Sequence, residues 1–105
     1  MLTMSQINEA VSKLIAAVHP KKVILFGSYA RGEATEHSDL DLMVIDPDMD
    51  LNRAEIEGRR AIGWMGVGVD ILAYDRQTVE ERADWCSSPI HWALEEGKVL
   101  YNAEA

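Results

Sequence analysis

Apart from a hydrophobic core, the sequence has few of the features that stabilise small proteins. Only one cysteine, Cys86, occurs among the 105 residues, so no internal disulfide can form and no second cysteine is present for a zinc site. No apolar run approaches the roughly 18 residues that a membrane-spanning helix needs. The N-terminus also lacks the charged-then-apolar pattern of a secretory signal. We therefore expect a cytoplasmic protein without membrane association.

Positive charge is also scarce. Ten Lys and Arg residues stand against 18 Asp and Glu residues, giving a net charge of −8, which disfavours direct binding to nucleic acid. The charge is unevenly spread: residues 1–32 hold four bases and one acid, whereas residues 33–50 hold seven acids and no base. Two of those acids, Asp39 and Asp41, fall in a predicted strand, where a solvated acidic surface explains them poorly.

The rest of the composition is that of an ordinary globular protein. Hydrophobic residues make up 48% of the chain and charged residues 27%, values at which wholesale disorder is not expected. The length suits one hydrophobic core, and no linker, repeat or low-complexity tract interrupts the sequence. We expect residues 1–105 to form a single domain.

The spacing of apolar residues predicts helices alternating with short strands. Positions three and four apart indicate amphipathic helices, and short continuous apolar runs bounded by glycine indicate buried strands. This pattern predicts an α/β fold of the α+β type, in which helices pack on a small mixed β-sheet. We expect helices over Ser5–His19, from an Asp50 cap through Ile56 to about Trp64, from a Thr78 capping box to about Trp85, and from Ser88-Pro89 to Gly97, with strands over 23–26, 39–45 and 67–73 and a short extended segment over 99–101.

Three aspartates on the predicted strands are the strongest chemical signal. Residues two apart in a strand point to the same side, so Asp39 and Asp41 present two carboxylates on one face while Leu40 and Leu42 face the core. Adjacent carboxylates repel each other unless a cation is bound, and hard oxygen ligands suit Mg²⁺. Asp70 would complete a three-carboxylate site if its strand neighbours the second one. The alternative is a set of exposed strand positions without a bound metal.

A glycine-rich turn precedes these acids. Gly27-Ser28 follows the first predicted strand and starts a tight turn, which we expect to lead into a short helical segment. A glycine there lets backbone N–H groups approach a phosphate, and the serine hydroxyl adds a donor. Ser28 could instead cap the short helix. Arg31 fits a phosphate contact and a structural ion pair with a nearby acid equally well.

The combination of these motifs resembles a known family. Gly27-Ser28, ten intervening residues, Asp39-x-Asp41 and a later strand-borne Asp70 resemble the polymerase-beta-type nucleotidyltransferases. The fuller pattern, Gly27-Ser28-x-Ala30-Arg31-Gly32 through Ser38-Asp39-x-Asp41, resembles the minimal nucleotidyltransferase (MNT) branch of that superfamily. Neither Gly-Ser nor Asp-x-Asp is specific alone, whereas the whole arrangement is.

The resemblance implies both a reaction and roles for individual residues. Asp39, Asp41 and Asp70 would be catalytic carboxylates that hold Mg²⁺, in the form of two ions, and Asp70 would also accept the proton of the attacking hydroxyl. The residues Gly27, Ser28 and Arg31 would bind the triphosphate of the substrate ATP. The implied chemistry is transfer of AMP to a hydroxyl with release of pyrophosphate, driven mostly by positioning and charge neutralisation.

The resemblance also implies a partner. Proteins of the minimal branch typically act as antitoxins that modify a tyrosine of a paired HEPN-domain ribonuclease toxin with AMP, so a heteromeric complex with such a toxin is expected. Two alternatives stay open: an antitoxin that inhibits by binding alone, and nucleotidyl transfer to a small-molecule hydroxyl, with a homo-oligomer building the acceptor pocket.

Overall fold

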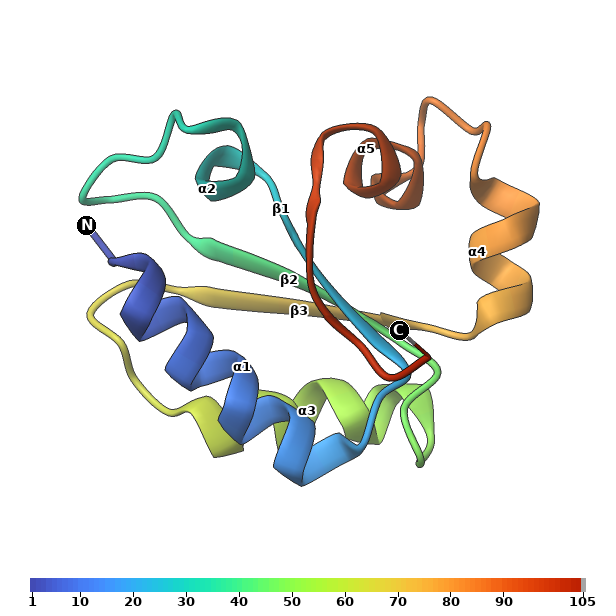
Figure 1. Ribbon diagram of the computed structural model, residues 1–105, viewed down its shortest axis with the longest axis horizontal. Helices are drawn as coiled ribbons and strands as arrows, with labels where there is room; N and C mark the ends of the chain where they lie inside the picture. The colour runs from blue at the N-terminus through green and yellow to red at the C-terminus, as the bar shows by residue number, and fades with distance from the viewer. Residues whose placement is uncertain (105) are drawn as a thin grey trace.

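The computed structural model describes residues 1–104 and has a four-stranded sheet at its centre, with helices on both faces (Figure 1). The strands lie in the order β3-β2-β1-β4. The β2–β3 pair is parallel, whereas β1 is antiparallel to both β2 and β4, so the sheet is mixed as expected. The elements along the chain are α1 (Met4–Val18), β1 (Lys22–Phe26), α2 (Ser28–Arg31), β2 (Leu40–Ile45), α3 (Leu51–Ile62), β3 (Val69–Tyr74), α4 (Arg76–Arg82), α5 (Pro89–Glu96) and β4 (Lys98–Asn102).

The central strand β2 is buried on both faces of the sheet. Its leucines Leu40 and Leu42, together with Val44, pack against α1 and α3, which confirms the side expected to face the core. Met43 and Ile45 point to the opposite face and pack with residues of α4 and α5. Because β2 is covered on both sides, its sequence is continuously apolar after Asp41 and does not alternate between apolar and polar residues.

Most helix boundaries follow the local capping signals. The Asp50 carboxylate accepts a hydrogen bond from the Arg53 N–H at the start of α3, and Ser88 caps α5 in front of a proline, both as predicted. The predicted capping box at Thr78 is wrong. Asp75 is the N-cap of α4, and the Thr78 N–H donates to its carboxylate, because aspartate is a stronger cap than threonine and already lies three residues upstream.

Two further boundaries differ slightly from expectation. Asp39 lies just before β2, which begins at Leu40, and β3 begins at Val69 rather than at residue 67. The extended segment over 99–101 is part of the edge strand β4. Among residues 1–104, no helix has the length and apolar character needed to cross a membrane.

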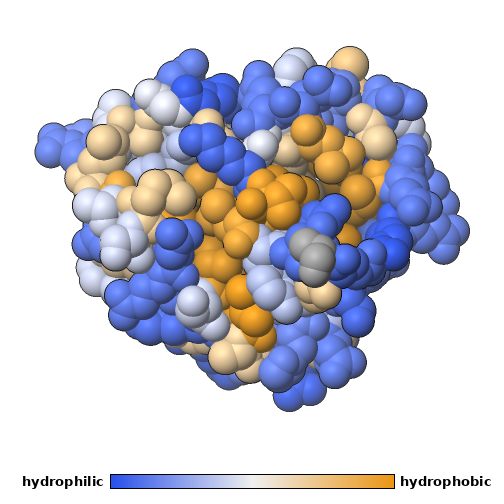
Figure 2. All heavy atoms as spheres, in the orientation of Figure 1, coloured by the Kyte–Doolittle hydropathy of each residue, from blue (hydrophilic) through white to orange (hydrophobic). Residues whose placement is uncertain are grey.

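The surface in the same orientation has both hydrophilic and apolar regions. Figure 2 shows hydrophilic side chains around the periphery of this face and an apolar band across its middle, between α5 and α1. Leu94 and Val99, from α5 and β4, are among the exposed apolar residues of the molecule.

Candidate active site

The predicted acids meet at one edge of the sheet, where β1 ends and both β2 and β3 begin. In the register, Phe26 of β1 lies opposite Asp41 of β2, and Asp41 lies beside Asp70 of β3. Because β2 and β3 are parallel neighbours, equivalent residues near their N-terminal ends point in the same direction. The condition under which Asp70 was expected to join the site, that its strand neighbours β2, is met.

Gly27 gives the Asp41 carboxylate the space that it occupies. Gly27 has a φ of +73°, a conformation that L side chains rarely adopt. A Cβ at Gly27 would overlap Oδ2 of Asp41 and lie 3.1 Å from its Cγ. Glycine is therefore required at position 27 for two reasons: the turn after β1 has a positive φ, and the Asp41 carboxylate packs against its Cα.

Asp39 lies against a different glycine. A Cβ at Gly68 would lie 2.6 Å from Oδ1 of Asp39, and the N–H of Leu40 donates to the Gly68 carbonyl over 2.9 Å. The backbone that leads into β3 thus packs directly on the residue that precedes β2. Asp39 and Asp70 are exposed, whereas Asp41 is half-buried between them.

The charge of the site is poorly compensated. Burial, together with the neighbouring carboxylates of Asp70 and Asp39 and a hydrogen bond from the protonated Asp41 to Asp70, raises the pKa of Asp41 to about 6. The Arg31 guanidinium lowers that pKa, but as the smallest of these effects. Such a set of carboxylates favours the binding of a cation.

The donor set fits a divalent cation by its chemistry. Asp41 and Asp70 lie within hydrogen-bond reach of each other, and carboxylate oxygens are the ligands that Mg²⁺ prefers. Within residues 1–104, no three His, Cys, Asp or Glu side chains converge closely enough to coordinate one ion. The third acid, Asp39, is directed against Gly68, so Asp41 and Asp70 are the pair best arranged to bind a cation.

The short helix α2 begins directly at the glycine turn. Gly27 occupies the N-cap position, and its carbonyl accepts hydrogen bonds from the N–H groups of Ala30 and Arg31. No side chain caps α2, so the alternative in which Ser28 caps this helix is wrong. The half-buried Ser28 is instead its first residue, beside the turn that holds Asp41.

Arg31 takes part in two ion pairs. Its Nε lies 3.2 Å from Oε2 of Glu33, and its Nη1 lies 3.6 Å from Oε2 of Glu96. The ion pair left open by the sequence therefore exists, while the guanidinium also acts on Asp41. Glu96 was not among the predicted site residues, because nothing in the local sequence links the end of α5 to the glycine turn.

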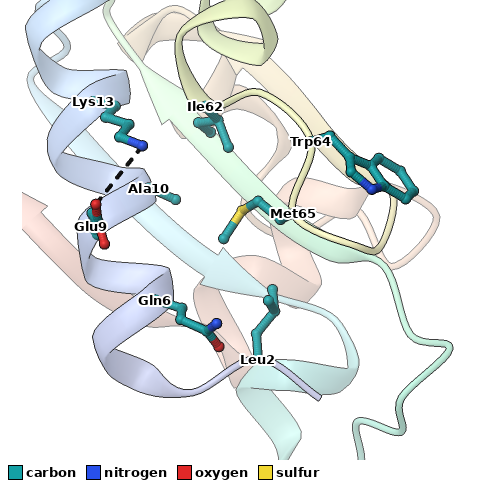
Figure 3. Close-up of a pocket in the computed structure, with 8 residues that line it drawn as sticks. All are labelled: Leu2, Gln6, Glu9, Ala10, Lys13, Ile62, Trp64 and Met65. Carbon is teal, nitrogen blue, oxygen red and sulfur yellow. Dashed lines mark ion pairs between the residues drawn. The ribbon is translucent and has the colours of Figure 1, made fainter.

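A separate hollow lies between α1 and the loop from α3 to β3. Figure 3 shows Met65 pointing into it and the ring of Trp64 directed away from α1. Glu9 and Lys13, 3.9 Å apart, form its rim on α1. None of the predicted site residues lines this hollow, so it is distinct from the site formed by Asp39, Asp41 and Asp70.

The family of the chain follows from comparison with known proteins. The family model of the nucleotidyltransferase domain matches residues 4–99. The chain belongs to this family and is a nucleotidyltransferase.

Related sequences point the same way. The chain is 36% identical over 81 residues to "Putative protein adenylyltransferase MJ0604" of Methanocaldococcus jannaschii, an alignment that covers 77% of this chain and 78% of the relative. It is 50% identical over 48 residues to "Putative protein adenylyltransferase MJ1379" of the same organism, covering 42% of this chain and 48% of the relative.

Solved structures share the fold. A crystal structure described as a toxin-antitoxin with AMP-PNP superposes with a TM-score of 0.60 at 24% identity, covering 90% of this chain and 73% of the other. A nucleotidyltransferase structure from Sulfolobus solfataricus, itself described as putative, gives 0.58 at 17% identity, covering 95% and 80%. The α+β nucleotidyltransferase fold expected from the sequence is confirmed.

Proposed function

We propose that the protein is a Mg²⁺-dependent adenylyltransferase that transfers AMP from ATP to a tyrosine hydroxyl of a cognate HEPN ribonuclease toxin, and so acts as its antitoxin. The observation that carries the proposal is the juxtaposition of the Asp41 and Asp70 carboxyls beside the Gly27 turn. The proposal adds a substrate, a metal and a target to the nucleotidyltransferase class.

In the proposed reaction, the carboxylates and the turn have separate roles. Asp41 and Asp70 would hold one Mg²⁺ ion, and Asp39, which lies against Gly68, would turn toward them to hold a second ion with them; the bound ions would offset the negative charge of the triphosphate. Gly27 and Ser28 would bind the triphosphate through backbone N–H groups and the hydroxyl.

The transfer step exchanges one phosphorus–oxygen bond for another. The acceptor oxygen forms a bond to the α-phosphorus of ATP, the bond from that phosphorus to the bridging oxygen of the β-phosphate breaks, and pyrophosphate leaves. Asp70, the exposed member of the facing pair, would accept the proton of the hydroxyl. Arg31 would bind the phosphates, where its positive charge adds to the stabilisation of the transferring group.

The proposed target rests on the relatives and on the surface. The curated relatives are named as protein adenylyltransferases, and two structural neighbours are described as toxin-antitoxin complexes. The net charge of −8 suits a protein acceptor better than a nucleic acid. The exposed side chains of Trp64, Trp85 and Trp92 are of the type that anchors protein interfaces.

The test is intact-mass spectrometry of the protein encoded beside this one, after incubation with this chain, ATP and MgCl₂. The expected result is a gain of one or more AMP masses that disappears with the Asp39→Asn/Asp41→Asn variant. The surface variant Asp84→Asn, which also removes a negative charge, should modify the target as the unaltered chain does. A stable complex without added mass would instead establish an antitoxin that acts by binding alone.

A further inference from the structure

We propose that Glu96, the last residue of α5, is a positioning residue that holds the Arg31 guanidinium in place to bind the nucleotide triphosphate. The inference rests on the phosphate-binding role proposed for Arg31. It makes the C-terminal end of α5, which carries none of the sequence motifs, part of the nucleotide site.

The contacts of Arg31 divide its donors into two groups. Glu33, just after the end of α2, pairs with Nε over 3.2 Å, and Glu96, from the last third of the chain, pairs with Nη1 over 3.6 Å. A guanidinium has five N–H donors in a rigid plane. The two carboxylates therefore restrain the guanidinium through Nε and Nη1, and neither ion pair uses Nη2, whose donors can serve a phosphate.

Glu96 is held in place by the backbone that follows it. Both α2 and α5 pack on β1 (Figure 1). A Cβ at Gly97 would overlap the Ala93 carbonyl oxygen and lie 2.9 Å from the carbonyl oxygen of Leu25. It would also lie 2.7 Å from Cγ2 of Ile24, so the end of α5 packs tightly on β1, the strand that leads into Gly27, and the position of Glu96 is tied to the position of the turn.

The residue type at position 96 works against the stability of its own helix. The C-terminal end of a helix carries partial negative charge and favours a cation, yet the last turn of α5 contains Glu95 and Glu96 and no base. Arg31 compensates Glu96. A residue that opposes the local preference and contacts a candidate substrate-binding group is typical of a functional position.

The guanidinium held in this way lies close to the reacting groups. Arg31 ends α2, the short helix that begins at the Gly27 turn and packs on both β1 and β2, the strand that carries Asp41. With Glu96 removed, the guanidinium would keep its ion pair with Glu33, an exposed residue just after α2. Because the guanidinium would then be less ordered before ATP binds, binding should require more loss of side-chain entropy.

The test compares Glu96→Gln with Glu95→Gln, which removes the same charge from the same turn of α5. We expect Glu96→Gln to raise the KM for ATP about three- to tenfold with kcat changed by less than about twofold, the scale of a partly exposed ion pair. Glu95→Gln should behave as the unaltered chain, and Glu96→Asp, which keeps the carboxylate, should recover part of the affinity. In an Arg31→Ala background, Glu96→Gln should have no further effect.

Direct binding separates this inference from the proposed function. A non-hydrolysable ATP analogue with MgCl₂ is titrated into each folded variant by calorimetry. If the unaltered chain binds the analogue and Glu96→Gln binds equally well or more tightly, or if the Glu96→Gln effect persists without Arg31, the positioning role is overturned while the function stands. If the unaltered chain binds no analogue, the proposed function is overturned and this inference with it.

Discussion

At the scale of single residues, the half-buried Asp41 determines how the site responds to pH. Its pKa of about 6 in the folded protein lies above the ordinary value of 3.8, so the folded state binds this proton more tightly than the unfolded state does. The resulting stabilisation is fully present below about pH 4 and is lost as the pH rises through 6. At neutral pH, the ionised carboxylate therefore destabilises the metal-free fold.

Asp41→Asn should consequently stabilise the metal-free protein while abolishing nucleotidyl transfer. The shift of about two pKa units corresponds to about 3 kcal/mol at most, and partial solvent screening reduces the expected gain to about 1–2 kcal/mol at pH 7.5. Urea denaturation in EDTA at pH 4 and pH 7.5 measures this gain, which should be much smaller at the lower pH. Equal stability of the two proteins at both pH values would contradict the raised pKa of Asp41.

Gly27 should tolerate no side chain. Gly27→Ala places a methyl group against the Asp41 carboxylate in a backbone conformation with φ of +73°, and we expect a loss of about 2–4 kcal/mol of stability. The double variant Gly27→Ala/Asp41→Ala removes the overlap and should recover part of that loss, leaving the cost of the backbone strain. Denaturation curves of the four proteins of this cycle measure the coupling, and additive effects would show that the two residues do not conflict.

At the scale of helices and strands, α4 provides a direct comparison of two capping signals. Asp75→Ala should lower the melting temperature more than Thr78→Ala, because the Asp75 carboxylate accepts the Thr78 N–H at the start of the helix. Hydrogen bonds from the side chain of Thr78 and, to a smaller extent, from its N–H lower the pKa of Asp75, so the contribution of the cap is present at neutral pH and lost as the pH falls below about 4. Thermal melts of both variants at pH 7 and pH 3 check the order, and a larger effect of Thr78→Ala would reverse the cap assignment.

The elements that the sequence predicted well are those with purely local signals. Asp50 and Ser88 cap their helices, and the apolar runs form the strands, because these preferences involve residues a few positions apart. Thr78 misled because an equally local signal, Asp75, lay just upstream. The neighbouring positions of Asp41 and Asp70 required the assumption that β3 pairs with β2, which the register bears out.

At the scale of the whole molecule, the unforeseen part of the site comes from chain topology. The pair between Arg31 and Glu96 joins the first and last thirds of the chain through their common packing on β1. No periodicity or motif encodes that contact, since it depends on the path of the chain after α4. The metal-binding and catalytic roles of the aspartates stay predictions, and the net charge of the molecule offers a way to test them.

The net charge of −8 should make the protein sensitive to salt in two separable ways. Monovalent salt screens the repulsion among 18 acids and should raise the melting temperature slightly. At equal ionic strength, MgCl₂ should raise the melting temperature further, because binding of Mg²⁺ at 100 times its dissociation constant adds about 2.7 kcal/mol to the free energy of unfolding. In Asp41→Asn/Asp70→Asn, which lacks both facing carboxylates, only the screening effect should remain, and Asp84→Asn should retain both. If MgCl₂ and NaCl of matched ionic strength stabilise the unaltered protein equally, Asp41 and Asp70 do not bind the metal.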